Sequence, residues 1–67
     1  MHVQSAAVSD IDYDDRDERL IVRFASGGRY AYFGVPPQEH RAFVEADSKG
    51  RFFQHRILDR YPFARLN

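Results

Sequence analysis

Hydrophobic and polar side chains alternate along the first half of the chain, with the period of two that is typical of a strand with one buried face. Three segments show this alternation: Val8–Tyr13, Arg19–Phe24 and Arg29–Val35. The charged connection Asp14–Glu18 separates the first two segments, and Ser26-Gly27-Gly28 separates the second from the third. Short turns between alternating segments predict a three-stranded antiparallel meander. Pro36-Pro37 then ends the third strand, because proline lacks the N–H that a strand ladder uses.

After these prolines the apolar spacing changes from two residues to between three and four, which predicts helices. His40, Phe43 and Val44 fall on one stripe of a first helix, expected at about Pro37–Ala46. Proline is well tolerated at the first helical position, since the N–H that it lacks would have no partner there.

A second helix is expected to follow, with Ser48 as its N-cap. Phe53, Ile57 and Tyr61 are four residues apart and share one face, and Pro62 ends the helix near Tyr61. The predicted fold class is therefore α+β: a three-stranded antiparallel meander followed by two short helices packed on one sheet face (βββαα). No element is expected in residues 1–7, which lack a clear pattern.

The length of the second hairpin loop decides which sheet face carries two central tyrosines. A three-residue loop places Tyr30 and Tyr32 beside Val22, on the buried face. A two-residue loop places them beside Arg23, as an exposed aromatic pair. A type I turn followed by a glycine bulge fits this sequence, which favours the three-residue loop, but the sequence leaves both registers open.

The chain has 67 residues, 43% of them apolar, and no cysteine. This length allows one small domain, residues 1–67, in which the 6 Phe and 4 Tyr must supply most of the core. The absence of cysteine excludes disulfides and cysteine-based zinc sites. No apolar run is long enough for a membrane span, and no secretory segment follows Met1, so we expect a cytoplasmic protein.

The net charge is zero, but the charges are unevenly distributed. Residues 1–18 hold six acidic residues and a single Arg, whereas residues 19–67 hold nine basic and four acidic residues. All the basic residues except Lys49 are arginines, whose planar guanidinium suits bidentate contacts with phosphate. A codon bias toward Arg explains the same composition without any function.

One further property of the chain is the order of its motifs: Ser9-x-Ile11-x-Tyr13-Asp14, Leu20-x-Val22-x-Phe24, Gly28-x-Tyr30-x-Tyr32, Val35-Pro36, Ala46-x-Ser48-Lys49-Gly50-x-Phe52-Phe53, Ile57 and Tyr61. Over about residues 5–62 this order resembles the KTSC domain. That short bacterial domain occurs alone and at the C-terminus of some lysyl-tRNA synthetases. His55, where Asn is more usual, and the long acidic turn depart from the family pattern. The resemblance implies no established function, although the synthetase attachment suggests RNA binding.

Two classes of function are open, and neither is enzymatic, because no catalytic constellation is present. As a nucleic-acid-binding module, the domain would stack bases of single-stranded RNA or tRNA on its tyrosines and contact phosphates with basic side chains. The residues expected in that site are Tyr30, Tyr32, Arg23, Arg29, Lys49, Arg51, His55, Arg56 and Arg60. An anion could also bind the helix N-terminus formed by Ser48, Lys49 and Gly50.

The alternative is a protein-interaction module, possible self-association included, since Tyr and Arg are enriched at protein interfaces. Neither a cofactor nor a metal is expected. His2, His40 and His55 are scattered and lack metal-ligand spacing. Asp10, Asp12 and Asp14 alternate along a strand but lack the Gly and Glu of a calcium loop, so we interpret them as a solvated edge that resists aggregation.

Overall fold

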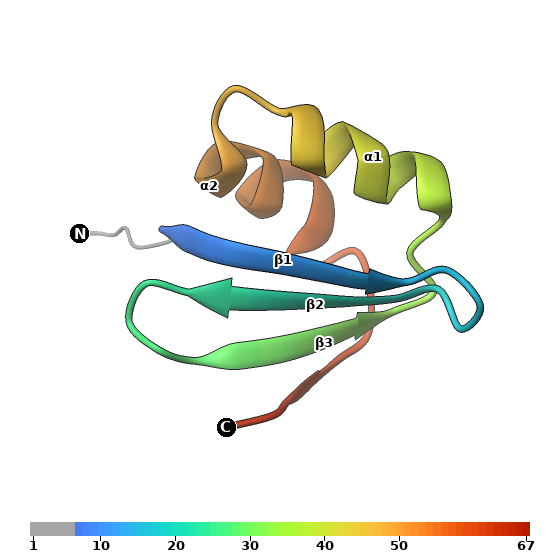
Figure 1. Ribbon diagram of the computed structural model, residues 1–67, viewed down its shortest axis with the longest axis horizontal. Coiled ribbons are helices and arrows are strands. Elements are labelled where there is room, and N and C mark those ends of the chain that lie inside the picture. Colours follow the sequence, from blue (N-terminus) through green and yellow to red (C-terminus); the bar gives the residue numbers. More distant parts are fainter. Residues whose placement is uncertain (1–6) are drawn as a thin grey trace.

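The structure, a computed structural model, describes residues 7–67; His2 and most of the irregular start expected at residues 1–7 lie outside this range. Its elements are β1 (Val8–Asp14), β2 (Arg19–Phe24), β3 (Arg29–Phe33), α1 (Pro37–Glu45), α2 (Lys49–Phe52), the π-helix η1 (Phe53–Ile57) and β4 (Phe63–Arg65). The strands form one antiparallel sheet in the order β1-β2-β3-β4. Both helical segments lie side by side next to β1 (Figure 1). The predicted α+β class is confirmed.

The fourth strand corrects the predicted three-stranded sheet. β4 pairs with β3, so that Tyr32 lies opposite Phe63 and Tyr30 opposite Arg65. Backbone hydrogen bonds flank this ladder: the Phe33 N–H donates to the Pro62 carbonyl at 2.9 Å, and the Leu66 N–H donates to Arg29 at 2.8 Å. Pro62 is compatible with this edge because only its carbonyl is used.

The second hairpin has the three-residue loop that we favoured. Val22 lies opposite Tyr30, and the Phe24 N–H donates to the Gly28 carbonyl at 2.9 Å. Gly27 closes the loop at φ 106°, a conformation that other residues rarely adopt. Both tyrosines therefore lie on the helix-covered face, and the exposed aromatic pair of the other register does not form.

Two elements end earlier than predicted. β3 ends at Phe33 instead of Val35, because Gly34 turns the chain at φ 80°. The second helix ends at Ile57 instead of near Tyr61, and its last turn is a π-helix in which the Leu58 N–H donates to the Phe53 carbonyl at 2.8 Å. Asp59 then adopts a positive φ of 67°, which is incompatible with a continuing helix.

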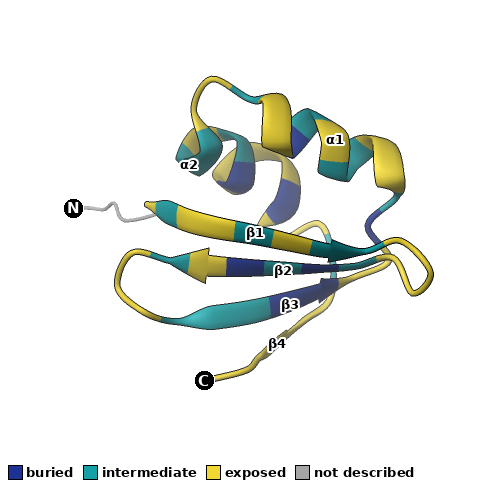
Figure 2. Cartoon of the chain, viewed as in Figure 1, coloured by how far each residue is buried: buried dark blue, intermediate teal, exposed yellow. Residues whose placement is uncertain are grey.

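The helices pack on one face of the sheet, as predicted, and bury a single core. Its members come from β2, β3, both helical segments and the β3–α1 connection: Leu20, Val22, Tyr32, Val35, Phe43, Phe53 and Ile57. Parts of β2 and β3 are buried, whereas β4 is exposed along its length (Figure 2). Within residues 7–67, each helix is too short to cross a membrane.

Candidate functional site

An aromatic groove opens on the helix-covered face of the sheet, at its β3–β4 end. The helical layer lies toward β1 (Figure 1), so the far end of this face is only partly covered. The groove has a volume of about 460 Å³, within the range of small-ligand sites. Its lining residues come from β2, the hairpin, β3, η1 and β4: Phe24, Ser26, Tyr30, Tyr32, Phe53, Gln54, Leu58 and Phe63.

Strand alternation builds the sheet wall of this groove. Tyr30 and Tyr32 are two residues apart on β3, so both point to the same face, and their ring centroids are 6.5 Å apart. Phe63 reaches them from β4, with ring centroids 5.9 Å from Tyr30 and 5.7 Å from Tyr32. These separations are those of contacting aromatic rings, so the wall is one continuous aromatic surface.

The π-helix η1 forms the opposite wall. Phe53 is buried and meets the Tyr32 ring edge-on at 5.5 Å and the Phe24 ring edge-on at 5.1 Å. Gln54 and Leu58, four residues apart, extend this wall outward, where Leu58 is exposed. A π turn is a less favourable arrangement than a regular α-turn and is frequent at functional sites.

The floor of the groove is Tyr32, whose side chain is 3% exposed. Burial, with smaller effects from Tyr30 and Asp59, raises the pKa of the Tyr32 phenol to about 12. The phenol therefore remains neutral at physiological pH, and the floor presents an uncharged aromatic surface to a ligand.

A cation lies at the rim. The Arg65 guanidinium stands over the Tyr30 ring, 5.9 Å from its centroid, and its Nε donates to the Asn67 carbonyl at 2.9 Å. Phe63 beside it is 58% exposed, a large fraction for an aromatic side chain. The groove thus combines exposed aromatic rings with a positive charge at one edge.

The sequence-predicted site residues do not form one surface. Tyr30 and Tyr32 lie in the groove, but Arg23 and Arg29 lie on the opposite sheet face, directly across from each other on β2 and β3. A ligand stacked on the tyrosines is therefore separated from these two arginines by the thickness of the sheet. The three-residue loop thus puts the tyrosines and these two arginines on alternate faces of the sheet, and a binding role for the arginines stays a prediction.

The basic residues of α2 and η1 are partly engaged within the fold. Lys49 Nζ donates to the Ala46 carbonyl at 2.8 Å, and Arg56 pairs with Glu39 at 3.1 Å. Arg56 also lies over the Phe52 ring, 5.2 Å from its centroid. Arg51, His55 and Arg56 are exposed, as is Arg60 beyond the end of η1. That these basic side chains contact phosphate stays a prediction.

Two side chains of the segment expected to bind an anion, Ser48 to Gly50, make hydrogen bonds within the fold. The Ser48 side chain accepts a hydrogen bond from the Arg51 N–H at 3.2 Å, which is the N-cap predicted for this residue. α2 has only four α-helical residues, and the Lys49 ammonium is directed back to the end of α1. The Ser48 hydroxyl and the Lys49 ammonium thus have partners within the fold, and anion binding at this segment stays a prediction.

Two important groove residues, Phe63 and Arg65, were missed because β4 was not predicted. The sequence contains only a short indication of this strand. In Phe63-Ala64-Arg65-Leu66, the large side chains of Phe63 and Arg65 alternate with two aliphatic residues. Phe24, at the end of β2, also lines the groove and was not among the predicted site residues. Among residues 7–67, no cluster of His, Asp and Glu has the grouping that a metal ion needs.

Comparison with known proteins places the chain among small bacterial domains. It is 43% identical over 51 residues to an uncharacterized protein from Stutzerimonas stutzeri, a match that covers 76% of this chain and 72% of that protein. A protein from Tsukamurella paurometabola is 34% identical over 59 residues, and 88% of each chain is covered. A lysine–tRNA ligase from Nostoc punctiforme is 30% identical over 64 residues, which are 96% of this chain but 11% of the ligase.

A solved structure and a family model also match the chain. The crystal structure of a KTSC domain protein from Yersinia pestis is 35% identical, with a TM-score of 0.88 over 97% of this chain and 92% of that chain. The family model of the KTSC domain matches residues 4–61, which leaves β4 just beyond the matched segment. The resemblance stated from the sequence motifs is confirmed, and the chain belongs to the KTSC domain family.

Proposed function

We propose that this domain is a binding module that takes a short single-stranded RNA segment into its aromatic groove. Membership of the KTSC family assigns no activity to the chain, so the proposal is supported by the groove itself. One observation carries it: aromatic rings, with Phe63 58% exposed, line an open cavity of about 460 Å³, and the Arg65 guanidinium lies over one of these rings, that of Tyr30.

The aromatic surface suits unpaired bases. Every base has an apolar face, and stacking on an aromatic side chain contributes about 1–3 kcal/mol per base. Phe63 is the most exposed ring of the groove at 58%, and Tyr30 next to it is half-buried. A base would stack on these two rings, whereas buried Tyr32 would form the floor on which the base edge rests.

The charges around the groove would orient the phosphate backbone of the RNA. Arg65 lies next to Tyr30, toward the hairpin end of β3, where a phosphate would meet a guanidinium. The acidic turn, residues 15–18, joins β1 to β2 at the opposite end of the sheet and would repel a phosphate backbone. The backbone would therefore follow the Arg65 side of the groove and avoid the acidic turn.

The relatives add a context for this proposal. A segment of the Nostoc punctiforme lysine–tRNA ligase, an enzyme whose name identifies tRNA as its substrate, matches almost this entire chain. A single-stranded end or loop of tRNA is consequently a reasonable natural source of the bases. Proteins recognise RNA sequence mainly in such unpaired regions, because the bases there are accessible.

The test is binding of a fluorescently labelled, unstructured oligonucleotide of mixed RNA sequence, followed by fluorescence anisotropy at low and moderate salt. We expect Phe63→Ala to weaken binding roughly 5- to 150-fold, as the loss of one stacking contact predicts. Val44→Ala is the matched control, because Val44 is an exposed apolar residue on α1, away from the groove. Binding should also weaken as salt rises, since phosphate contacts release counterions.

Two results would contradict the proposal. Equal affinities for Phe63→Ala, Val44→Ala and the unmodified protein would show that the RNA binds elsewhere. No binding at millimolar RNA would exclude RNA as the ligand, and exposed Phe63 and Leu58 would then indicate a protein partner as the ligand of the groove.

A further inference from the structure

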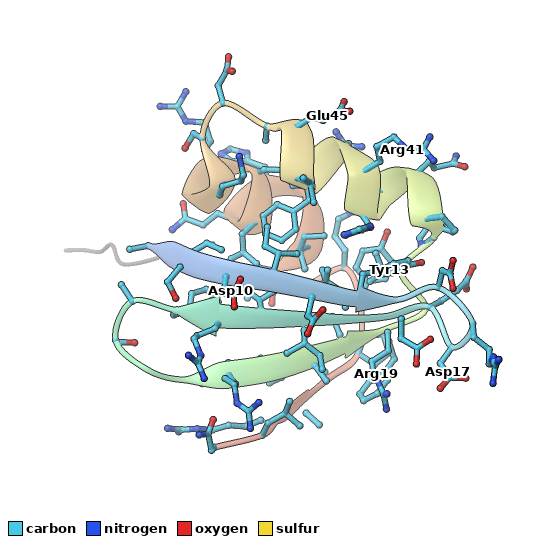
Figure 3. All side chains as sticks on the ribbon, viewed as in Figure 1. Asp10, Tyr13, Asp17, Arg19, Arg41 and Glu45 are labelled. Carbon is cyan, nitrogen blue, oxygen red and sulfur yellow. The ribbon has the colours of Figure 1, made fainter. Side chains whose placement is uncertain are left out.

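The open face of the sheet, opposite the helices, carries a regular pattern of charge that the groove does not use. Because side chains alternate along a strand, every second residue of each strand points to this face. The acidic side chains all belong to β1, and the basic ones to β2 and β3: Asp10, Asp12 and Asp14, then Arg19, Arg23 and Arg29. Figure 3 labels Asp10 on β1 and Arg19 on β2.

The strand register arranges these residues in rows across the sheet. In the first row Asp10 lies opposite Arg23, which lies opposite Arg29. In the last row Asp14 lies opposite Arg19, and Phe33 follows on β3. The face thus has an acidic edge formed by β1 and a basic column beside it, both running along the strands.

Few of these charged side chains form an ion pair within the chain. Within residues 7–67, the sole ion pair on this face joins Arg19 to Asp14, with 3.5 Å between Nη2 and Oδ2. Arg23 and Arg29 are like charges in directly opposed positions, an arrangement that destabilises a sheet. Asp10 and Asp12 line a shallow hollow of about 220 Å³ with these two arginines, and no ion pair shorter than 4.0 Å closes it in the described residues.

Apolar side chains lie between the charged rows. The middle row places Ile21 opposite Ala31, and Phe33 follows two residues later on the same side of β3. Ile21 is half-buried, Ala31 is buried and Phe33 is 39% exposed, and both helical segments lie on the opposite face of the sheet. A sheet face with an apolar centre and charged columns is suited to association with a complementary surface.

We infer that this face binds a second copy of the same chain, sheet against sheet, around a twofold axis parallel to the strands. Such a rotation keeps each row at its own level and reverses the order of the strands. It places the acidic edge of one copy over the basic column of the other, so that Asp10 faces Arg23 or Arg29 of the second copy. Twofold pairs are the commonest protein assemblies, and stacked sheets lie about 10 Å apart, a distance that such side chains span.

A twofold axis perpendicular to the strands within the interface gives a different result. It reverses the order of the rows and keeps the strand order, so the acidic edge of each copy meets the acidic edge of the other. Juxtaposed like charges disfavour that orientation. The charge pattern therefore selects one relative orientation of the two copies.

The test is sedimentation equilibrium of three samples at low salt: Asp10→Arg, Arg23→Glu, and their equimolar mixture. Each variant alone brings like charges together in its own dimer and should dimerise more than roughly tenfold more weakly than the unmodified chain. In the mixed pair, position 10 of one copy and position 23 of the other are again oppositely charged at both contacts. The mixture should therefore recover the dimer.

Three controls make this result specific. Arg51→Glu changes an exposed charge on α2 and should leave dimerisation unchanged, and circular dichroism of each variant should show that it is folded. Phe63→Ala should also leave dimerisation unchanged, because the groove opens on the other sheet face. High salt should weaken the dimer of the unmodified chain.

A monomer at millimolar concentration and low salt would overturn the inference. It would also be overturned if both variants dimerised like the unmodified chain, or if the mixture associated no better than either variant alone. None of these outcomes bears on RNA binding in the groove, so the two proposals fail independently.

Discussion

The two ends of the helix-covered sheet face contain the same kinds of residue in opposite surroundings. At the end covered by α1, Phe43 is 0% exposed and stacks on Phe52 with ring centroids 5.2 Å apart. At the β3–β4 end, Phe63 contacts two tyrosines and remains 58% exposed. α1 has nine residues, and α2 and η1 together have nine, and these segments lie toward β1 (Figure 1), so the β3–β4 end stays only partly covered.

This difference separates apolar residues that stabilise the fold from those available to a ligand. Each buried aromatic side chain removes a large apolar area from water, which a domain of 67 residues needs. An aromatic side chain left mostly exposed contributes little to folding, and it adds to an apolar surface that water contacts. The sealed end therefore stabilises the fold, and the open end is the part of this face available to the proposed ligand.

The largest effect should come from truncating the sealed end. Phe43→Ala should lower the free energy of unfolding by about 3–5 kcal/mol, because it leaves a cavity in the core. Phe63→Ala should cost less than about 1 kcal/mol, since its ring is mostly in water already. Urea denaturation of both variants measures this contrast, and equal losses would show that the groove is part of the stabilising core.

Alkaline pH should lower the free energy of unfolding through Tyr32, which lies between the sealed and the open end of the covered face. The Tyr32 pKa is raised from 10.0 to about 12, so the folded protein retains a proton that the unfolded chain releases. The contribution of the protonated Tyr32 phenol to the free energy of unfolding is fully present below pH 10. It is lost as the pH rises from 10 through 12, a decrease of roughly 2–3 kcal/mol. Thermal melting of Tyr32→Phe should show a shallower decrease over this pH range, and an unchanged pH profile would refute the assignment.

A smaller effect is expected from the cap of the second covering helix. Ser48→Ala removes the hydrogen bond to the Arg51 N–H and should destabilise the domain by about 1 kcal/mol. Ser26→Ala is the matched control, because Ser26 is exposed in the hairpin and should have almost no effect on stability. If both serines behaved alike in thermal melts, the capping role would be excluded.

The smallest effect concerns the ion pair that joins the two covering segments. Glu39 on α1 and Arg56 on η1 are 3.1 Å apart near the surface. Glu39→Gln should cost less than about 1 kcal/mol, and the difference from the unmodified protein should shrink at high salt. A loss that persists at high salt would indicate that Glu39 acts through packing and not through charge.

The parts of the fold that depend on local signals were predictable. Alternation located β1, β2 and β3, and the glycines after Ser26 favoured the correct hairpin loop. The Ser48 cap was likewise identified from its residue type and the helix that follows. In each case the deciding interactions join residues close together in the chain.

The groove could not be predicted because it depends on contacts between distant residues. β4 has three residues, too few for an alternating pattern to stand out, and its stability comes from pairing with β3. The hydrogen bond from Lys49 to Ala46 is local, whereas the pairing of Arg56 with Glu39, 17 residues earlier, depends on how the helices pack. Residue type identified these bases as candidates, whereas tertiary structure determined which of them remain exposed.

The most direct test of the account is a titration of the isotope-labelled protein with unstructured single-stranded RNA, followed by the aromatic and amide NMR signals. We predict that the ring signals of Phe63 and Tyr30 shift strongly, because bases stack on them, whereas the ring of Phe43 does not respond. Shifts confined to the open sheet face or to α2, with Phe63 and Tyr30 unmoved, would contradict the division of the covered face into a stabilising end and a binding end.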